Sequence, residues 1–460
     1  MDATLAFAHK YAQAKYNDIP IEEVEFQKKQ FLDTLGTTLG GSDKPGIKEL
    51  LAVVKKWGGK RQSSILDYGI RVPAPNAAQV NATMAHALDY DNGDPEALVH
   101  TGCVVVPTCL AAAEQKGGVT GKEYITAATL GTDIMCRLGI ATRPNGNVTG
   151  TGWHFTMLYG FLGASVIAGK ILGLNEDQIL NAMGIAYHQS AGNLQCVSDG
   201  ALTKRMGPGF AAKGGITSAL MAEQGITGAK HCLGADYGLY NLYHYGDYDN
   251  KILVQDLGKV FRGVNVGFKP YPCCGITHVY IDAMLELVNQ YKIKPSDVDS
   301  ILLIGGEAGR ELCTPLEIKR KPRNYIDAQF SLPWTVATAI VIGKPCMEHF
   351  TEESIQNENI LNIAQKIDFE YNPKLTSHGA FGTGIVRIST KKRKVFTKQV
   401  DYPLGSPERP LSFDDCAQKF FDCASYAIKP ISKDKLERIV ELTKQLELLN
   451  DLDEIIQLIR

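Results

Sequence analysis

Residues 155–172 read FTMLYGFLGASVIAGKIL, a long segment that is apolar or small on almost every side. Gly160, Gly163, Ala164 and Gly169 recur along it at spacings that bring small residues onto the same faces of a helix. Small residues allow neighbouring helices to approach closely, and a helix that is apolar all round is buried. We therefore predict a buried central helix in a helical domain.

The segments on both sides of this helix are also long and rich in Ala, Gly and Leu, a composition typical of helices. In the segment 18–41, Pro20 stands at a helix start, and Gly40 and Gly41 stand at its end. Further helices are predicted at 79–89, 104–115, 122–138, 176–194 and 210–224.

The pattern changes after residue 263, where short β-rich segments appear. They lie at 300–304, 367–371, 384–390 and 395–400, with helices predicted between them at 277–290 and 332–342. The last two strands flank a basic tip at 391–394, which indicates a hairpin. Helical periodicity returns from residue 412. The predicted class is mainly α: a discontinuous helical domain, residues 1–264 and 401–460, with a smaller inserted α+β lid domain, residues 265–400.

Composition excludes several classes of function. The chain has 460 residues, and its 48 basic and 50 acidic residues give a formal charge of −2, which argues against a nucleic-acid or polybasic membrane role. We expect no membrane span, because no apolar run reaches the ~18–20 residues required. Residues 1–15 have no apolar leader core. Eleven cysteines without a CxxC pair indicate reduced thiols and a cytoplasmic protein.

Common cofactor and hydrolase motifs do not occur. The sequence has no GxxxxGK[ST] loop, no strand-anchored GxGxxG, no HExxH and no GxSxG. The glycine-rich stretch at 145–152 lacks a preceding strand, so we interpret it as a flexible loop rather than a nucleotide site.

Polar residues near helix ends are the remaining candidates for chemistry. The stretch 85–101 reads AHALDYDNGDPEALVHT, with Asp89, Asp91 and Asp94 clustered and His100 at the start of the next helix. Helix capping and a solvated loop are the alternative explanation for these residues. His154 begins the central helix, where the helix dipole favours a neutral imidazole suited to act as a base. An ordinary helix cap is the alternative.

Two groups of basic residues could meet an anionic ligand. Lys204 and Arg205 precede a predicted helix, where cations oppose the dipole unless they bind a carboxylate beside the helix amides. A solvated basic pair is the alternative. Lys269 lies in GFKPYPCCG at the change from helical to mixed character, a position suited to a cleft. Cys273 and Cys274 in the same segment are interpreted as buried thiols.

Together these segments resemble the MmgE/PrpD family, which includes 2-methylcitrate dehydratase, cis-aconitate decarboxylase and iminodisuccinate epimerase. The similarity covers almost the whole chain and rests on blocks at 19–41, 81–114, 153–174, 203–228, 268–275, 329–334 and 405–412.

The resemblance implies a helical domain with a smaller α+β lid, a homodimer, a site between the domains, and no metal or organic cofactor. The catalytic residues that it implies are Asp89, His100, His154, Lys204 and Lys269. Candidate substrate contacts are Arg205, Asp91, Trp334 and Cys274. Three positions depart from the family motifs: Asn92 replaces the last aspartate of LDYDD, Gly207 replaces a histidine, and Trp334 replaces a tyrosine.

The function expected on this basis is that of a cofactor-independent lyase acting on a small di- or tricarboxylate. The first choice is dehydration of a β-hydroxy acid through a carbanion beside a carboxylate. Epimerisation or decarboxylation of a dicarboxylate is the close alternative. An inactive ligand-binding scaffold and a metal-dependent hydratase using Asp89, Asp91 and His100 are kept as other classes. No nucleic-acid or membrane partner is expected.

Overall fold

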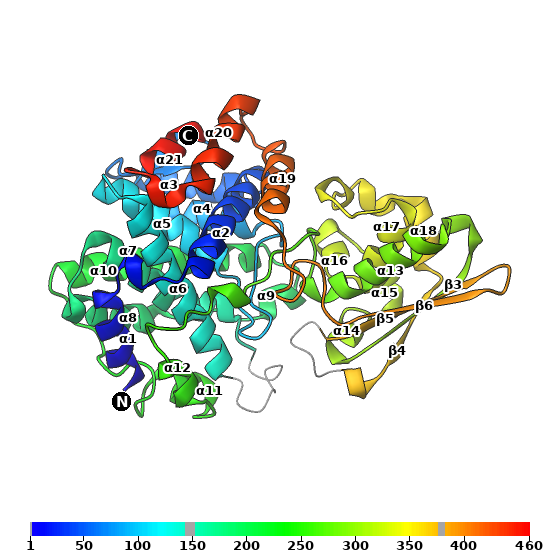
Figure 1. The fold of residues 1–460 in the computed structure, drawn as a ribbon, viewed down its shortest axis with the longest axis horizontal. Coiled ribbons are helices and arrows are strands. Elements are labelled where there is room, and N and C mark those ends of the chain that lie inside the picture. Colours follow the sequence, from blue (N-terminus) through cyan, green and yellow to red (C-terminus); the bar gives the residue numbers. More distant parts are fainter. Residues whose placement is uncertain (1, 143–151, 376–381) are drawn as a thin grey trace. The chain divides into compact units, whose positions relative to one another are not determined.

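The computed structural model describes residues 2–142, 152–375 and 382–460. These residues fall into two compact units (Figure 1). Unit 1 comprises Met1–Ala87, Asp91–Val266 and Ser412–Arg460, and unit 2 comprises Leu88–Tyr90 and Gly267–Leu411. Of the glycine-rich stretch 145–152, residues 145–151 lie outside the described part of the chain.

Unit 1 is built almost entirely of helices, so the prediction of a mainly α protein is confirmed. Its helices are α1 (Ala3–Gln13), α2 (Ile21–Gly40), α3 (Ile47–Trp57), α4 (Ala74–His86), α5 (Gly102–Lys116), α6 (Gly121–Ala141), α7 (Phe155–Leu172), α8 (Glu176–Gln189), α9 (Gln195–Ser198), α10 (Thr203–Glu223), α11 (Leu239–His244), α12 (Asn250–Val254), α19 (Phe413–Ala424), α20 (Lys433–Lys444) and α21 (Asp453–Leu458).

Helix α7 is the buried centre of unit 1, as its small residues predicted. It packs against α6 and α10. A Cβ atom added at Gly160 would lie 2.9 Å from the Cβ atom of Ala211, and one added at Gly163 would lie 2.7 Å from Cγ of Met135. The glycines therefore permit the close approach of the three helices.

The expectation that no segment could span a membrane was wrong for α7. By length and composition this helix could cross a bilayer, and it is the one such helix among the described residues. However, 89% of it is buried inside the structure. The core position of α7 explains its apolar surface, because a helix enclosed by other helices needs no polar face.

The C-terminal helices complete unit 1. Figure 1 shows α19 and α20, in orange and red, near the blue helix α2, and both contact α2. Gly36 of α2 makes the contact with α19 possible, because an added Cβ atom would lie 3.0 Å from the Cα atom of Phe420. The sequence did not predict the short antiparallel hairpin of β1 (Ser63–Ile65) and β2 (Ile70–Val72).

Unit 2 contains a four-stranded sheet of β3 (Val298–Gly305), β4 (Ile367–Tyr371), β5 (Gly384–Thr390) and β6 (Val395–Val400). The strand order is β4-β3-β5-β6, with β3 and β4 parallel and the other pairs antiparallel. The hairpin predicted around 391–394 is confirmed. The helices of this unit are α13 (His278–Tyr291), α14 (Glu307–Glu311), α15 (Leu316–Arg320), α16 (Tyr325–Gln329), α17 (Leu332–Val341) and α18 (Glu358–Ala364).

Two segments belong to unit 2 although the sequence placed them in the helical domain. Residues 401–411 join it because the backbone N–H of Leu404 donates to Asp282 of α13 over 2.6 Å. Residues 88–90 join it through the side chain of Gln329, which donates to the carbonyl oxygen of Leu88 over 2.7 Å. Both segments make further long-range polar contacts within unit 2, among them Arg409 with Asp282 and Lys269 with Asp89. Contacts of this kind leave no trace in local periodicity.

Candidate active site

The connection between α4 and α5, residues 87–101, carries the aspartates and the histidine singled out in the sequence. Asp94 caps a turn within it, because its Oδ1 accepts from the backbone N–H groups of Glu96 and Ala97. Asp94 and Val99 also pair as a short antiparallel bridge. Burial raises the pKa of Asp94 to about 6. For Asp94 the structure therefore supports the capping explanation.

Asp91 lies between two imidazoles. His86, the last residue of α4, donates from Nδ1 to Oδ2 of Asp91 over 2.8 Å, and both side chains are fully buried. Nδ1 of His100 lies 3.5 Å from the same carboxylate oxygen. The rings of His86 and His100 are 5.0 Å apart. A carboxylate in this position orients both rings and stabilises their charged forms.

His100 is held in a defined tautomer by the backbone. Its Nδ1 donates to the carbonyl oxygen of Asn92 over 2.9 Å, and a carbonyl oxygen can only accept. The neutral ring consequently carries its proton on Nδ1 and its lone pair on Nε2. The His100 side chain is 23% exposed, so unlike His86 it is accessible to a ligand.

Asn92, which replaces the last aspartate of the family motif, belongs to a network of hydrogen bonds between uncharged groups. Its Nδ2 donates to Oε1 of Gln30 over 2.9 Å, and its Oδ1 accepts from the backbone N–H of Gly102 over 2.8 Å. Thr101 donates to the same oxygen of Gln30 over 2.6 Å. The amide of Asn92 supplies a donor that an aspartate cannot supply, so the replacement suits its surroundings.

His154 and Lys204 also lie near this group. His154 is the residue before α7, is 9% exposed, and its ring lies 6.1 Å from that of His86. Lys204 lies in the first turn of α10. Burial and the Asp91 carboxylate raise the pKa of the Cys103 thiol, and the Lys204 ammonium acts in the opposite direction. The structure therefore gathers His100, His154, Asp91 and Lys204 in unit 1.

Helix α10 begins earlier than predicted. It starts at Thr203 and continues through Pro208, whereas the sequence suggested a start at Phe210. Lys204 and Arg205 are thus helical residues. Arg205 is 5% exposed and donates from its guanidinium to the carbonyl oxygen of Pro45 over 3.1 Å, which ties α10 to the turn before α3.

A neighbouring side chain occupies the space beside Gly207, where family members have a histidine. A Cβ atom added at Gly207 would lie 2.1 Å from Cε of Met157, so Met157 of α7 fills the space beside this glycine. Met157 is 6% exposed. The change removes a titratable group from the start of α10 and substitutes apolar volume.

Lys269 and Asp89 form a pair within unit 2. Nζ of Lys269 donates to Oδ2 of Asp89 over 3.1 Å and to the Asp89 carbonyl oxygen over 2.8 Å. Both side chains are less than a tenth exposed. Tyr90 adds a hydrogen bond to the carbonyl oxygen of Pro270. Asp89 therefore orients the ammonium of Lys269.

The other two candidate residues in unit 2, Trp334 and Cys274, pack against its hydrophobic core. Trp334 is fully buried in the hydrophobic core, with its ring 5.4 Å from that of Phe350. Cys274 is partly buried and packs against the same core, and its backbone N–H donates to the Gln329 carbonyl oxygen. These positions support packing roles. All eleven cysteines, Cys273 and Cys274 included, are free thiols.

The sequence analysis missed His86 and Cys103. His86 stands three residues before Asp89 at the end of a predicted helix, and Cys103 stands three residues after His100. Their positions close to Asp89 and His100 could have identified them. A residue near the end of one helix and a residue near the start of the next can lie close together when the connection is short.

The chain belongs to the MmgE/PrpD family. The MmgE/PrpD N-terminal domain matches residues 5–250, and the MmgE/PrpD C-terminal domain matches residues 271–445. The resemblance inferred from the sequence blocks is thus confirmed.

Two kinds of relative carry the names of enzymes. Cis-aconitate decarboxylase of Aspergillus terreus is 26% identical and covers 97% of this chain and 96% of its own length. Cis-aconitate decarboxylase of Homo sapiens is 25% identical, with 97% and 92% covered. 2-Methylcitrate dehydratase of Escherichia coli is 23% identical, with 82% and 81% covered.

Proposed function

We propose that the protein is a lyase that acts on a small di- or tricarboxylate and removes water from a β-hydroxy acid. The observation that carries this proposal is the grouping of two imidazoles, a buried carboxylate and an ammonium in unit 1. Dehydration needs a base for the carbon-bound proton and an acid for the departing hydroxyl, and imidazoles serve both roles near neutral pH.

His100 is the better placed base. The hydrogen bond from its Nδ1 to the carbonyl oxygen of Asn92 puts the lone pair on Nε2, and the partial exposure of the ring leaves it accessible. Asp91 stabilises the imidazolium that forms when Nε2 takes the proton. His154, at the start of α7, then acts as the acid that protonates the leaving hydroxyl.

The carbanion places charge on the neighbouring carboxylate, so a fixed cation lowers the barrier. Lys204 supplies this cation in unit 1. Lys269, oriented by Asp89, is proposed as a further carboxylate ligand on the pattern of the family. Arg205 supports the first turn of α10 through its bond to Pro45.

Decarboxylation of an unsaturated tricarboxylate is the second candidate. The chain is similar to cis-aconitate decarboxylases as well as to 2-methylcitrate dehydratases, at 26% and 23% identity, so this reaction is kept as the alternative. The two reactions share the carbanion. Decarboxylation, however, requires only one proton donor, whereas the structure offers two imidazoles.

Proton NMR in D2O distinguishes these reactions on one panel: 2-methylcitrate, citrate, malate, tartrate, cis-aconitate and iminodisuccinate. New vinyl signals from a hydroxy acid identify dehydration. Vinyl signals from cis-aconitate together with released CO2 identify decarboxylation. Loss of an α-proton signal without a new compound identifies epimerisation. An unchanged panel, with no ligand that raises the melting temperature, would refute the proposal and favour the scaffold.

Variants test the assigned roles. Lys204→Ala and His154→Ala should each lower kcat by at least about 100-fold, the scale of one acid–base group or one electrostatic contact. Lys213→Ala, on the same helix but over the ring of Trp57, and His188→Ala, exposed on α8, are matched controls that should retain activity. Near-normal activity of both test variants would contradict the assignment.

We also propose a homodimer in a reducing, cytoplasmic compartment. Eleven free thiols support the compartment, because disulfides form and persist in oxidising surroundings. The dimer rests on the family resemblance, and light scattering after gel filtration tests it.

A further inference from the structure

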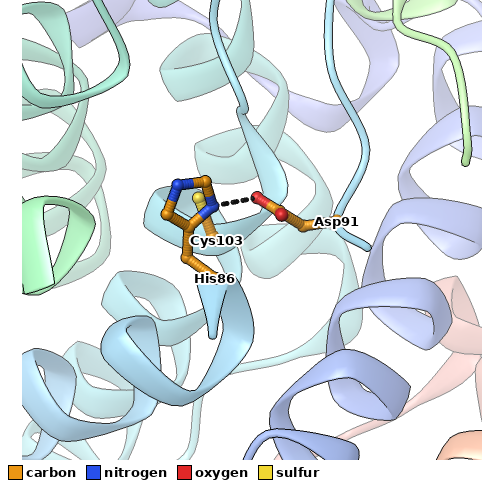
Figure 2. A group of neighbouring side chains, drawn as sticks. All are labelled: His86, Asp91 and Cys103. Carbon is orange, nitrogen blue, oxygen red and sulfur yellow. Dashed lines mark hydrogen bonds and ion pairs between the residues drawn. The ribbon is translucent and has the colours of Figure 1, made fainter. Parts of the chain in front are cut away.

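The group drawn in Figure 2 consists of His86, Asp91 and Cys103, and its side chains point toward one another. A ring nitrogen of His86, a carboxylate oxygen of Asp91 and Sγ of Cys103 all lie within 4.8 Å of one another. His86 ends α4, Asp91 lies in the following connection, and Cys103 is the second residue of α5. Three backbone segments therefore deliver one nitrogen, one oxygen and one sulfur to a common point.

We propose that His86, Asp91 and Cys103 form a binding site for a thiophilic divalent cation, with Zn²⁺ as the best fit. Zinc accepts imidazole nitrogen, carboxylate oxygen and thiolate sulfur, and three protein ligands leave one position for a water molecule. In tetrahedral coordination such ligand atoms lie about 3.4–3.6 Å apart. The present spacings reach that value with shifts of about an ångström.

Charge balance favours a dication at this point. The three side chains are buried, and a buried net charge is costly. A carboxylate and a thiolate together cancel the two charges of the ion, so the loaded centre is neutral. The thiol proton of Cys103 leaves to solvent, and the proton on Nδ1 of His86 moves to Nε2.

The position of Cys103 suits an anionic sulfur. It is the second residue of the fifteen-residue helix α5, and the free amides at a helix N-terminus favour a thiolate. A zinc ion that binds cysteine displaces the thiol proton, so metal binding by this group releases a proton.

Binding has a consequence for catalysis that rests on the proposed function. Asp91 also faces His100, so a cation that takes over this carboxylate withdraws it from the proposed base. We therefore expect Zn²⁺ to inhibit turnover. The binding itself is independent of the reaction, and its measurement requires no substrate.

The test is a Co²⁺ titration of the full-length protein, followed by its thiolate-to-cobalt charge-transfer band, with Zn²⁺ as competitor. Cys346 is exposed and could bind metal by itself, so all variants carry Cys346→Ser. One equivalent of Co²⁺ should bind with the band, and Zn²⁺ should displace it. Cys103→Ser should abolish the band and weaken Zn²⁺ binding at least ~100-fold, the upper scale for loss of a supporting contact.

Cys109→Ser is the matched control. Cys109 lies on the same helix and is equally buried, but burial alone raises the pKa of its thiol. The control should keep the band and the affinity. A band that persists in Cys103→Ser, or no stoichiometric binding in the Cys346→Ser parent, would overturn the proposal.

Crystals soaked in Zn²⁺ give a second measurement that needs no variant. Anomalous density at the zinc edge should lie among His86, Asp91 and Cys103, and density elsewhere only would overturn the assignment. Activity in the NMR panel without binding would refute the metal site and leave the proposed function intact. Stoichiometric metal binding without any reaction in the NMR panel would support the metal site and refute the proposed function.

Discussion

Replacing Glu23 by Gln should make the stability of the protein less dependent on pH. Glu23 lies in the first turn of α2 and is 2% exposed, and its Oε1 accepts from the backbone N–H of Val264 over 3.1 Å. Burial raises the pKa of this carboxyl from 4.5 to about 7. The hydrogen bond from Val264 lowers it, and the nearby Asp133 raises it further.

The magnitude follows from the difference between the folded and unfolded pKa values. A rise from 4.5 to about 7 is about 2.5 units, which corresponds to about 3 kcal/mol at 1.36 kcal/mol per unit. Because the folded pKa is raised, the contribution of Glu23 to stability is complete below pH 4.5 and is lost as the pH rises through about 7. A glutamine at this position cannot ionise and has no such loss.

Urea unfolding followed by circular dichroism measures the effect at several values between about pH 4.5 and about pH 8. The free energy of unfolding of the wild type, minus that of Glu23→Gln, should fall by about 3 kcal/mol across this range. Glu22→Gln is the control, because Glu22 is adjacent and exposed and its charge affects the Glu23 pKa less than burial, the backbone hydrogen bonds or Asp133 do. Its difference from the wild type should therefore change far less with pH. Parallel curves for wild type and Glu23→Gln would refute the reasoning.

Two further substitutions test the departures from the family motifs. Asn92→Asp should lower the free energy of unfolding by about 1–3 kcal/mol, because the donor to Oε1 of Gln30 is replaced by a charged acceptor; equal urea midpoints would contradict this. Gly207→Ala places a Cβ atom 2.1 Å from Cε of Met157 and should cost about 1–3 kcal/mol, much of it recovered in the background Met157→Ala. A double-mutant cycle without coupling would show that Met157 does not fill this space.

Local patterns predicted the elements that depend on local physics. The small residues of 155–172 predicted the central helix, and the β-rich run at 395–400 has the bounds of β6. Each of these two predictions depends on residue types that recur at regular spacing within one segment. The start of α10 was predicted at residue 210, whereas the helix begins at Thr203 and contains Pro208. In the structure the helix passes through it, since α10 packs closely against α7 and α4.

The features that could not be predicted depend on contacts between residues far apart in the sequence. Nothing in the local sequence shows that Gln329 holds the Leu88 carbonyl oxygen, or that Asp282 holds Leu404. His86 is a different case, because its partner Asp91 is only five residues away and lies in the irregular connection after α4. Residue type identified candidates such as Lys204, whereas the relation between His86, Asp91 and Cys103 required coordinates.

Asn92 shows how one such departure can alter chemistry without altering the fold. Its side chain is fixed by Gln30 and Gly102, while its carbonyl oxygen fixes the tautomer of His100. An amide in place of the family's aspartate preserves this geometry but leaves one carboxylate fewer in the loop around His100. A nearby negative charge stabilises an imidazolium, so its removal makes the imidazole a weaker base and a stronger acid. In Asn92→Asp the added carboxylate should hold the proton on the proposed base His100 more tightly, so the pH profile of kcat should move to higher pH.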